Sequence, residues 1–489
     1  MTKGTSVWDF VQRAVRALLA LVAIVTFVLM TGPLALAQTL TTLHNFCEQD
    51  NCPNNPYGSM IQATDGNLYG ITISAGNTGT VFSITLSGAL TTLHTFESPS
   101  LTYPSGGLIQ AANGNFYGTT VYGIGDTDYG AIFELTPTGT LTTLYNFCAL
   151  GTYPFCTDGF AVNSELVQVA NGDIYGATER GGVNDCGTIF KITPSGTLTT
   201  LYNFLAHAGG HYPLGGLIRA SNGDFYGTTE LGGANKDGVV FSMTESDTVT
   251  TLNSFNGTDG EFALGLTEAD NGDFYGITDL GGPDGFGTVF KMNARGNLTA
   301  LYTFCSQGAY PYCTDGANPQ SSLIQATDGN FYGMTVDGGA NDAGVIYRIT
   351  PDGAMSTIYT FCSQQPPDCT DGVHPYGALV QATNGDLYGA TSQGGTGQGG
   401  TIFSLSVGLG PFVALRTTSG KVGAKVAILG TNLTGATSVA FNGTPAGFAV
   451  NSTGSAILAA VPVGATSGTV TVTMPSGVLS SDKLFTVLD

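Results

Sequence analysis

A six-residue pattern that recurs seven times constrains the fold of this chain more than any other feature. Its clearest copy is Asn222-Gly223-Asp224-Phe225-Tyr226-Gly227. Consecutive copies lie 48 to 58 residues apart, measured between their tyrosines. A repeat of this length is typical of solenoids and propellers, in which each repeat is one supersecondary unit. The seven tyrosines are Tyr69, Tyr117, Tyr175, Tyr226, Tyr275, Tyr332 and Tyr388.

Each repeat contains four strand-like segments in a constant order. In one repeat these are residues 217–220, 225–229, 239–243 and 249–255. The second segment is aromatic and β-branched, which is typical of strands. The Asn222-Gly223 pair before it predicts a two-residue type I′ hairpin turn, because both residues tolerate positive φ angles. The repeats therefore predict an all-β fold.

The ends of the repeat region predict how the fold closes. The region opens with a lone fourth strand at 40–46 and ends with the first three strands of a repeat at 378–405. Joining these pieces gives a seven-bladed β-propeller of four-stranded blades, with the N-terminal strand closing the last blade. Closure would pair two edges that are otherwise open. An open β-solenoid is the alternative, and it leaves residues 40–46 without an obvious partner.

The N-terminus has the features of a secretion signal. Lys3, Arg13 and Arg16 precede an apolar run at 17–30, and Ala35-Leu36-Ala37 forms a small-x-small cleavage pattern. A membrane span needs about 20 apolar residues, so an uncleaved anchor is the less favoured alternative. We expect residues 1–37 to be a signal peptide and the mature protein to be secreted or displayed at the cell surface, with no later membrane span.

Cysteine usage agrees with export. Eight of the nine cysteines form close pairs, each directly after a fourth strand. In an exported protein this pattern predicts short-range disulfides. Zinc is the alternative, but Cys-x-x-Cys spacing and neighbouring histidines are lacking, and Cys186 is left over. The predicted disulfides are Cys47–Cys52, Cys148–Cys156, Cys305–Cys313 and Cys362–Cys369.

Composition excludes some partners. The formal net charge is −21, and nucleic acids and anionic membranes need Lys or Arg to neutralise their phosphates. Neither is therefore expected as a partner. The single tryptophan, Trp8, lies in the signal segment, and no nucleophile motif such as Gly-x-Ser-x-Gly has a supporting acid and base.

Because strands alternate in direction, two kinds of loop share one face of the predicted propeller. They connect the second to the third strand, and the fourth strand to the next repeat; we call this the variable-loop face. Function concentrates on variable loops carried by a rigid scaffold. Carboxylates there could bind calcium or act as a glycosidase acid/base pair, whereas simple Asp-Gly turn formation is the alternative. The candidate binding residues are Asp158, Asp185, Asp237, Asp259, Asp284, Asp315, Asp342 and Asp371.

The recurring Tyr-Gly of the second strand predicts packing between blades. Glycine there would allow another backbone to approach closely. The alternative is a ring of tyrosine hydroxyls that binds sugar. No cofactor other than calcium is suggested by the sequence.

The unit Asn-Gly-Asp-Phe-Tyr-Gly, then Gly-Gly-x-x-x-x-Gly-Thr-Ile-Phe-Lys-Ile-Thr-Pro-x-Gly and Leu-Thr-Thr-Leu-Tyr-x-Phe, resembles the GloVer-type tandem repeat of exported bacterial proteins over residues 38–407. The resemblance implies export and surface association and carries no catalytic residues. Residues 408–489 contain short alternating strands that predict a β-sandwich. Their order resembles a TIG/IPT immunoglobulin-like domain, which implies a spacer or interaction module.

Together these features predict a non-catalytic secreted or cell-surface binding protein. It would recognise a glycan or a protein through the variable-loop face. The alternatives are an extracellular polysaccharide-active enzyme that uses loop carboxylates, and a structural matrix component, stabilised by calcium in one version.

Overall fold

The computed structural model describes residues 38–47, 54–73, 79–96, 103–121, 129–152, 155–205, 209–364 and 366–488. The predicted signal peptide, residues 1–37, lies outside this part of the chain. Residues 39–489 form one structural unit. Within the described residues its regular structure is all β apart from one 3₁₀ turn, η1 (Leu433–Gly435). No helix in the described ranges is long and apolar enough to cross a membrane.

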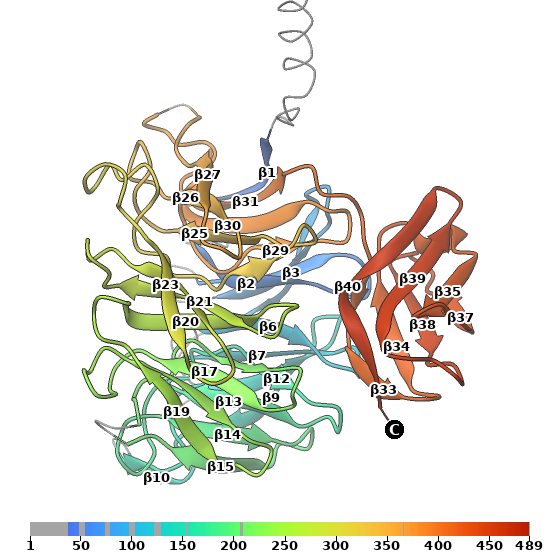
Figure 1. Cartoon of the computed structure of the whole chain (residues 1–489), viewed down its shortest axis with the longest axis horizontal. Coiled ribbons are helices and arrows are strands. Elements are labelled where there is room, and N and C mark those ends of the chain that lie inside the picture. The colour runs from blue at the N-terminus through green and yellow to red at the C-terminus, as the bar shows by residue number, and fades with distance from the viewer. Residues whose placement is uncertain are drawn as a thin grey trace, which may run out of the picture. The chain divides into compact units, whose positions relative to one another are not determined.

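The repeats form antiparallel four-stranded, propeller-like sheets that follow one another in sequence order (Figure 1). Six such sheets lie in the described part of residues 56–360. Their strands are β2 (Pro56–Gln62), β3 (Leu68–Thr72), β4 (Thr80–Ile84) and β5 (Leu90–Thr95); β6 (Pro104–Gln110), β7 (Phe116–Thr120), β8 (Ala131–Leu135) and β9 (Leu141–Asn146); β12 (Val167–Gln168), β13 (Ile174–Thr178), β14 (Thr188–Ile192) and β15 (Leu198–Asn203); β16 (Leu217–Arg219), β17 (Phe225–Thr229), β18 (Val239–Met243) and β19 (Val249–Ser254); β20 (Glu261–Glu268), β21 (Phe274–Leu280), β22 (Thr288–Met292) and β23 (Leu298–Thr303); β24 (Ile324–Gln325), β25 (Phe331–Thr335), β26 (Val345–Ile349) and β27 (Met355–Thr360). A small hairpin of β10 (Gly151–Thr152) and β11 (Phe155–Cys156) lies between two of the sheets in sequence.

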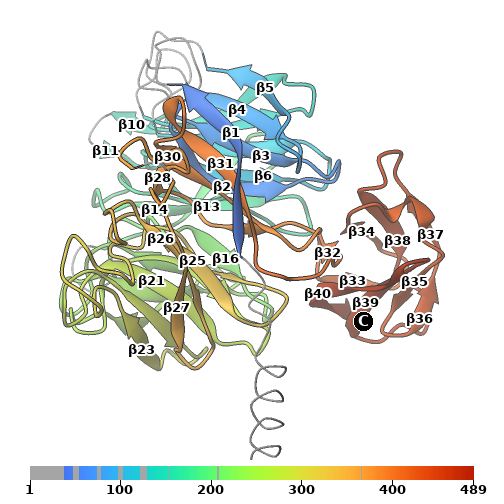
Figure 2. The same ribbon diagram turned by 90° about the horizontal axis from the view of Figure 1, so that it is seen from above.

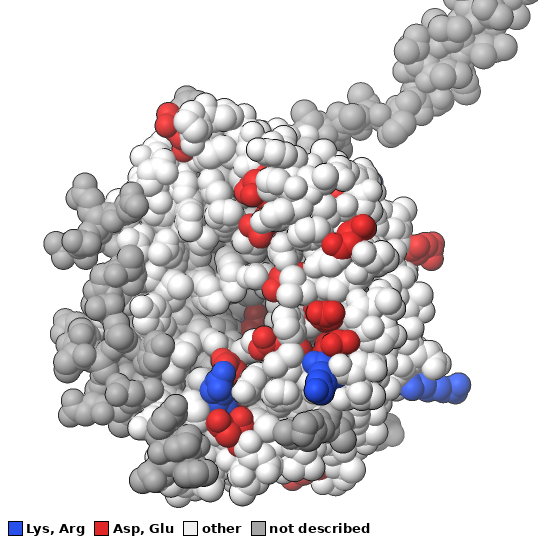
Figure 3. Space-filling view, turned by 90° about the vertical axis from the view of Figure 1, so that its left-hand side faces the viewer, with Lys and Arg blue, Asp and Glu red and all other residues white. Residues whose placement is uncertain are grey.

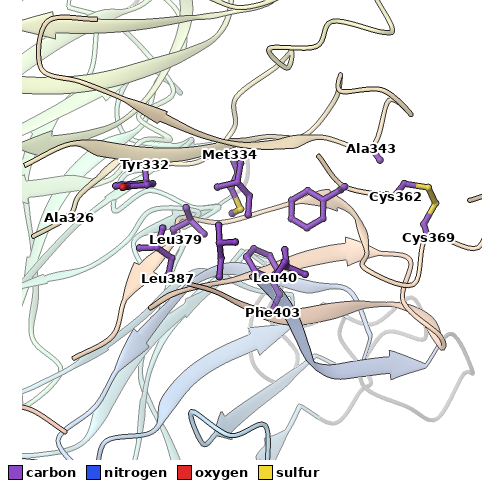
Figure 4. Close-up of a cluster of buried hydrophobic side chains, with 13 residues drawn as sticks. Leu40, Ala326, Tyr332, Met334, Ala343, Cys362, Cys369, Leu379, Leu387 and Phe403 are labelled. Carbon is purple, nitrogen blue, oxygen red and sulfur yellow. A yellow bond between two sulfur atoms is a disulfide. The ribbon is translucent and has the colours of Figure 1, made fainter. Parts of the chain in front are cut away.

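A further sheet, of five strands, follows these six and combines both ends of the repeat region; we call it the last sheet. It contains β28 (Val373–Pro375), β29 (Val380–Gln381), β30 (Leu387–Gln393), β31 (Gln398–Ser406) and β1 (Thr39–Cys47). Strand β1 pairs antiparallel with β31, with Leu40 opposite Leu405, and the two lie side by side in Figure 2. Leu40 is buried with Leu387 and Phe403 in one apolar cluster (Figure 4). As the sequence predicted, the lone N-terminal strand completes the last sheet.

Neighbouring sheets are fastened by a recurring hydrogen bond that we call the inter-sheet clasp. A side-chain oxygen on the last residue of the first strand accepts a backbone N–H from the first turn of the preceding sheet. Gln62 thereby reaches Thr383 at 2.9 Å, which joins the first sheet to the last. Within the described residues the other clasps are Gln110–Thr64, Gln168–Ala112, Glu268–Ser221, Gln325–Asp270 and Gln381–Thr327.

The six-residue pattern packs between sheets, as predicted. The Tyr226 ring stacks on Phe274 of the next sheet with centroids 4.2 Å apart. The glycine has a different role from the one expected. A Cβ atom at Gly227 would lie 2.6 Å from Cζ of Phe241, so glycine chiefly makes room for an aromatic ring of its own sheet. The same stacking joins Tyr69 to Phe116, Tyr175 to Phe225 and Tyr275 to Phe331.

The predicted type I′ turn is wrong. Gly223 has a φ of +93°, but Asn222 is not among the described residues with positive φ. The N–H of Gly223 bonds to the Ala220 carbonyl, and the N–H of Ala220 bonds to the carbonyl of Asp224, which closes a longer turn. The Asn222 side chain accepts the N–H of Asp224 at 3.0 Å. This local bond supports the turn from Asn222, and only glycine needs the left-handed region.

The C-terminal residues form two further sheets that share an apolar core. Val426, Ile457 and Val472 are among its buried members. One sheet contains β32 (Ala414–Leu415), β34 (Lys425–Leu429), β38 (Ala456–Ala460) and β37 (Phe448–Val450); the other contains β33 (Ser419–Lys421), β40 (Gly477–Leu488), β39 (Gly468–Met474), β35 (Ser438–Phe441) and β36 (Thr444–Ala446).

Hydrogen bonds join this C-terminal segment to the first-strand turns of the propeller-like sheets. Ser455 and Asn451 both donate to the Thr64 carbonyl, at 2.8 and 3.1 Å. Arg416 donates to the carbonyl of Gln110. These turns lie at the opposite ends of the strands from the variable loops, so these contacts leave the variable-loop face uncovered.

Candidate functional site

Three of the predicted site residues are structural. Asp158, Asp315 and Asp371 are at most 1 % exposed. Each accepts hydrogen bonds from a tyrosine hydroxyl at 2.7–2.8 Å and from backbone N–H groups of the loop that precedes it in the chain. Their oxygens are therefore committed to shaping the loop and are not presented to a ligand.

The same loops contain three of the four predicted disulfides. Cys148–Cys156, Cys305–Cys313 and Cys362–Cys369 are bonded, which confirms those pairs. Cys52 lies outside the described residues, so the fourth pair stays a prediction. Cys186 is buried, and its thiol donates to the Asn184 carbonyl at 3.2 Å.

The other predicted carboxylates do not form one site. Asp185 and Asp342 adopt positive φ and accept the N–H of Gly181 and Gly338, which braces their own loops. Asp259 accepts both the backbone N–H and the side-chain amide of Asn256, three residues earlier. Asp237 is half-buried, and Asp284 is exposed.

A different set of acidic residues gathers on the variable-loop face. Glu179, Glu230 and Asp279 each directly follow the threonine that comes after Tyr-Gly-x in the second strand, and Asp337 follows one residue later. We call these four residues the acidic mouth. Figure 3 shows this face, where carboxylates collect beside a central hollow. In the sequence they are marked by an acidic residue just after that threonine, whereas the predicted candidates all lie elsewhere in the loops of this face.

Two tyrosines from opposite ends of the repeat region pack against each other. Tyr57 and Tyr376 stack with centroids 4.3 Å apart, and the Tyr57 hydroxyl donates to that of Tyr376 at 3.0 Å. Burial first, and then the charge of Glu179, raises the pKa of Tyr57. Burial first, then the neighbouring Tyr57 hydroxyl and the charge of Asp279, raise the pKa of Tyr376. The stack and the hydrogen bond thus join the first and the last sheet on this face.

Burial and neighbouring like charges raise the pKa values of carboxyl groups in the acidic mouth. Burial first, and then the negative charge of Glu179, raises the pKa of Glu230, whereas Arg180 opposes the shift. Burial likewise raises the pKa of Asp279, and Asp337 adds to it. Burial also raises the pKa of Asp337, which His374 partly offsets from 3.5 Å. Like charges in a partly desolvated space favour the neutral acid.

Polar side chains brace these carboxylates. Asn163 donates to Glu179 at 3.2 Å, and Gln320 donates to Asp279 at 3.4 Å. Arg180 forms an ion pair with Glu179 at 3.3 Å and lies over the Tyr212 ring. Within the described residues, no three His, Cys, Asp or Glu side chains are placed to hold a metal ion.

An exposed aromatic surface borders the mouth. Tyr310 and Tyr312, in the loop closed by Cys305–Cys313, are 50 % and 62 % exposed. Phe286 stacks on Tyr310 with centroids 4.9 Å apart and an interplanar angle of 11°. The charges of Asp337, a residue of the acidic mouth, and of Asp342 raise the pKa of Tyr310. We call Phe286, Tyr310 and Tyr312 the aromatic platform. In the sequence it is marked by Tyr-Pro-Tyr between the paired cysteines Cys305 and Cys313.

The solved structures that match this chain are distant in sequence. A fungal alcohol oxidase of the AA5 family in complex with copper matches 92 % of this chain and 99 % of its own, at 11 % identity and a TM-score of 0.46. A putative gluconolactonase matches 65 % and 92 % at 13 % identity (TM-score 0.36). A gluconolactonase from Xanthomonas campestris matches 76 % and 90 % at 12 % identity (TM-score 0.39). No curated protein matches the chain.

The repeat itself has a family assignment. The profile of the Gloeobacter/Verrucomicrobia repeat matches residues 33–161, 152–315 and 265–456. These matches span most of the chain and include every copy of the six-residue pattern. The chain therefore belongs to the Gloeobacter/Verrucomicrobia repeat family.

Proposed function

We propose that this protein is a non-catalytic, secreted or cell-surface protein that binds a glycan at the acidic mouth and the aromatic platform. In this proposal the repeats form a seven-bladed β-propeller closed by β1. Residues 408–489 form an immunoglobulin-like sandwich of the TIG/IPT type that serves as a spacer. The predicted signal peptide and the disulfides of the loops support an extracellular location.

The observation that carries the proposal is the rigid aromatic platform beside carboxylates. Sugar rings present apolar C–H faces that pack on tyrosine rings, and hydroxyls that donate to carboxylates. Tyr310 is held by its stack on Phe286 and by the disulfide, so little conformational freedom is lost on binding.

A glycan array with protein that begins at Gln38 tests the proposal. Tyr310→Ala and Tyr312→Ala should each weaken the best glycan by about tenfold, because an aromatic contact is worth roughly 1 kcal/mol or more. Leu150→Ala is the matched control, since Leu150 is 59 % exposed in another disulfide loop. Binding that survives both tyrosine changes would exclude the platform as the site.

Glycoside hydrolysis is the second candidate. The raised pKa of Glu230, beside an Arg-paired Glu179, resembles the split between acid and base that glycosidases need. Turnover of a polysaccharide panel that disappears in Glu230→Gln would favour it. Binding without turnover would favour the non-catalytic proposal.

A further inference from the structure

One joint between sheets brings together two tyrosines that lie 319 residues apart in the chain. Tyr57 belongs to β2, and Tyr376 directly follows β28 of the last sheet. Their rings stack with centroids 4.3 Å apart and an interplanar angle of 21°, and the Tyr57 hydroxyl donates to the Tyr376 hydroxyl at 3.0 Å. The two phenol rings therefore meet along their faces and also at their hydroxyl-bearing ends.

Comparison of the repeats shows that this pairing is specific to one joint. Each repeat has a residue at the corresponding position, three residues before the buried Met or Leu of its first strand. Tyrosine stands there in the first and the last repeat, which meet at the joint between the ends of the repeat region. The other repeats carry Ser105, Asn163, Leu214, Ala263 and Gln320.

The contact has the geometry that oxidative coupling of two phenols requires. A phenoxyl radical carries unpaired spin on the ring carbons next to the carbon that bears oxygen. The stack and the hydrogen bond already hold these edges of the two rings together. Both side chains are half-buried and so keep some contact with solvent. The recurring stacks between other sheets, such as Tyr226 on Phe274, lack the second hydroxyl and cannot couple in this way.

We propose that Tyr57 and Tyr376 are a covalent modification site, joined by a dityrosine bond when a peroxidase reduces hydrogen peroxide outside the cell. Each phenol loses one electron and one proton, and the two phenoxyl radicals combine through a new carbon–carbon bond. The hydrogens displaced from these two carbons return to the oxygens as protons. The two electrons and two protons released in the first step reduce one hydrogen peroxide to two waters. The bond needs the extracellular location proposed above, but it does not need glycan binding.

The bond closes the repeat region covalently. Its two ends are otherwise joined by the pairing of β1 with β31 and by the clasp of Gln62 on Thr383, which are both lost on unfolding. A cross-link lowers the entropy of the unfolded chain more when the enclosed loop is longer, and this loop spans 319 residues. The cross-linked protein should therefore unfold at a higher temperature.

Treatment of dilute protein that begins at Gln38 with a peroxidase and one equivalent of hydrogen peroxide tests the inference. Mass spectrometry of a digest should show one peptide pair that joins the segments of Tyr57 and Tyr376 and has lost two hydrogen atoms. The Tm of the monomeric product should rise by about 5 °C, because closure of a long loop stabilises the protein. Free tyrosine in a parallel tube must give dityrosine, which shows that the oxidant works.

Two variants make the test specific. Tyr376→Phe keeps an aromatic ring in the stack but removes one coupling partner, so the peptide pair and the rise in Tm should both be lost. Tyr202→Phe is the matched control, because Tyr202 is a half-buried tyrosine of β15, and this variant should retain both. A digest without the Tyr57–Tyr376 pair, under conditions in which free tyrosine couples, would overturn the inference. Cross-links of similar yield spread over other tyrosines would overturn it as well.

Discussion

The hydroxyl of Tyr302 donates a hydrogen bond to the buried carboxylate of Asp315 at 2.8 Å. The same carboxylate accepts the N–H groups of Ser306 and Gln307, at 2.9 and 3.2 Å. It therefore acts as an internal template for the loop that holds the aromatic platform. Tyr145–Asp158 and Tyr359–Asp371 repeat the arrangement.

Replacing the buried Asp315 should destabilise the protein. In Asp315→Ala, two loop N–H groups and the Tyr302 hydroxyl lose their acceptor, and buried unpaired donors cost about 1–3 kcal/mol each. We expect the free energy of unfolding to fall by about 3 kcal/mol, measured by urea denaturation. Asp284→Ala, at an exposed position, should stay within about 0.5 kcal/mol of the parent. Equal effects of the two changes would show that the buried carboxylate does not stabilise the loop.

The thermal stability of the protein should depend on the carboxyl groups of the acidic mouth. Folding raises the pKa of Glu230 and Asp279. Such groups take up protons on folding, so their contribution to the free energy of unfolding falls as the pH rises through the window between the unfolded and folded pKa values. Glu230→Gln and Asp279→Asn should therefore raise the Tm at pH 7 by about 1–3 °C.

The increase in Tm should become smaller as the medium is acidified to about pH 4, because Glu230 and Asp279 of the parent protein are then protonated as well. Scanning calorimetry across this range checks both statements. Asp284→Asn is the control and should shift the Tm equally at all pH values. A gain that grows on acidification would contradict the raised pKa values.

The N-terminal strand should be essential to the last sheet. Leu40 is buried against Leu387 and Phe403, and Leu40→Ala should cost about 2–4 kcal/mol of unfolding free energy. Thr41→Ala, on the exposed side of the same strand, is the matched control. Urea midpoints give the comparison; similar midpoints for both variants would mean that β1 adds little to the sheet.

Replacing the last glycine of the six-residue pattern with alanine should destabilise the protein. Gly227→Ala places a Cβ 2.6 Å from the Phe241 ring and 3.0 Å from the Gly216 carbonyl oxygen. Overpacking of this kind costs about 1–3 kcal/mol. Gly447→Ala, where nothing lies within 4 Å of the added Cβ, should be close to neutral. Thermal unfolding of the two variants would show no difference if Phe241 moved aside freely.

Much of the fold was predictable because it is encoded locally and repeatedly. The Phe-Tyr-Gly strand, the turn glycines and the paired cysteines each lie within a few residues of their partners. The phase of the repeat also predicted the pairing of β1 with β31, because a lone fourth strand has one vacant edge to fill. The turn type was predicted incorrectly because an Asn side chain competes for the backbone in a way that dihedral preference alone does not express.

The site was less predictable because it depends on contacts between repeats. Asp315 was predicted as a candidate binding residue, and only the path of its loop around it shows that it is buried. Glu179 and Asp279 are 100 residues apart in the chain, and the arrangement of the sheets brings both toward the tyrosine pair.

One joint between sheets differs from the rest. Arg219 occupies the clasp position of β16, but it bonds to the Gly223 carbonyl and to Glu245 of its own sheet. The joint at which the repeat region begins and ends is fastened by β1 and by Gln62, whereas this mid-chain joint has no clasp among the described residues. Under mechanical load we expect the first separation between the sheets β12–β15 and β16–β19, far along the chain from the sheet that β1 completes.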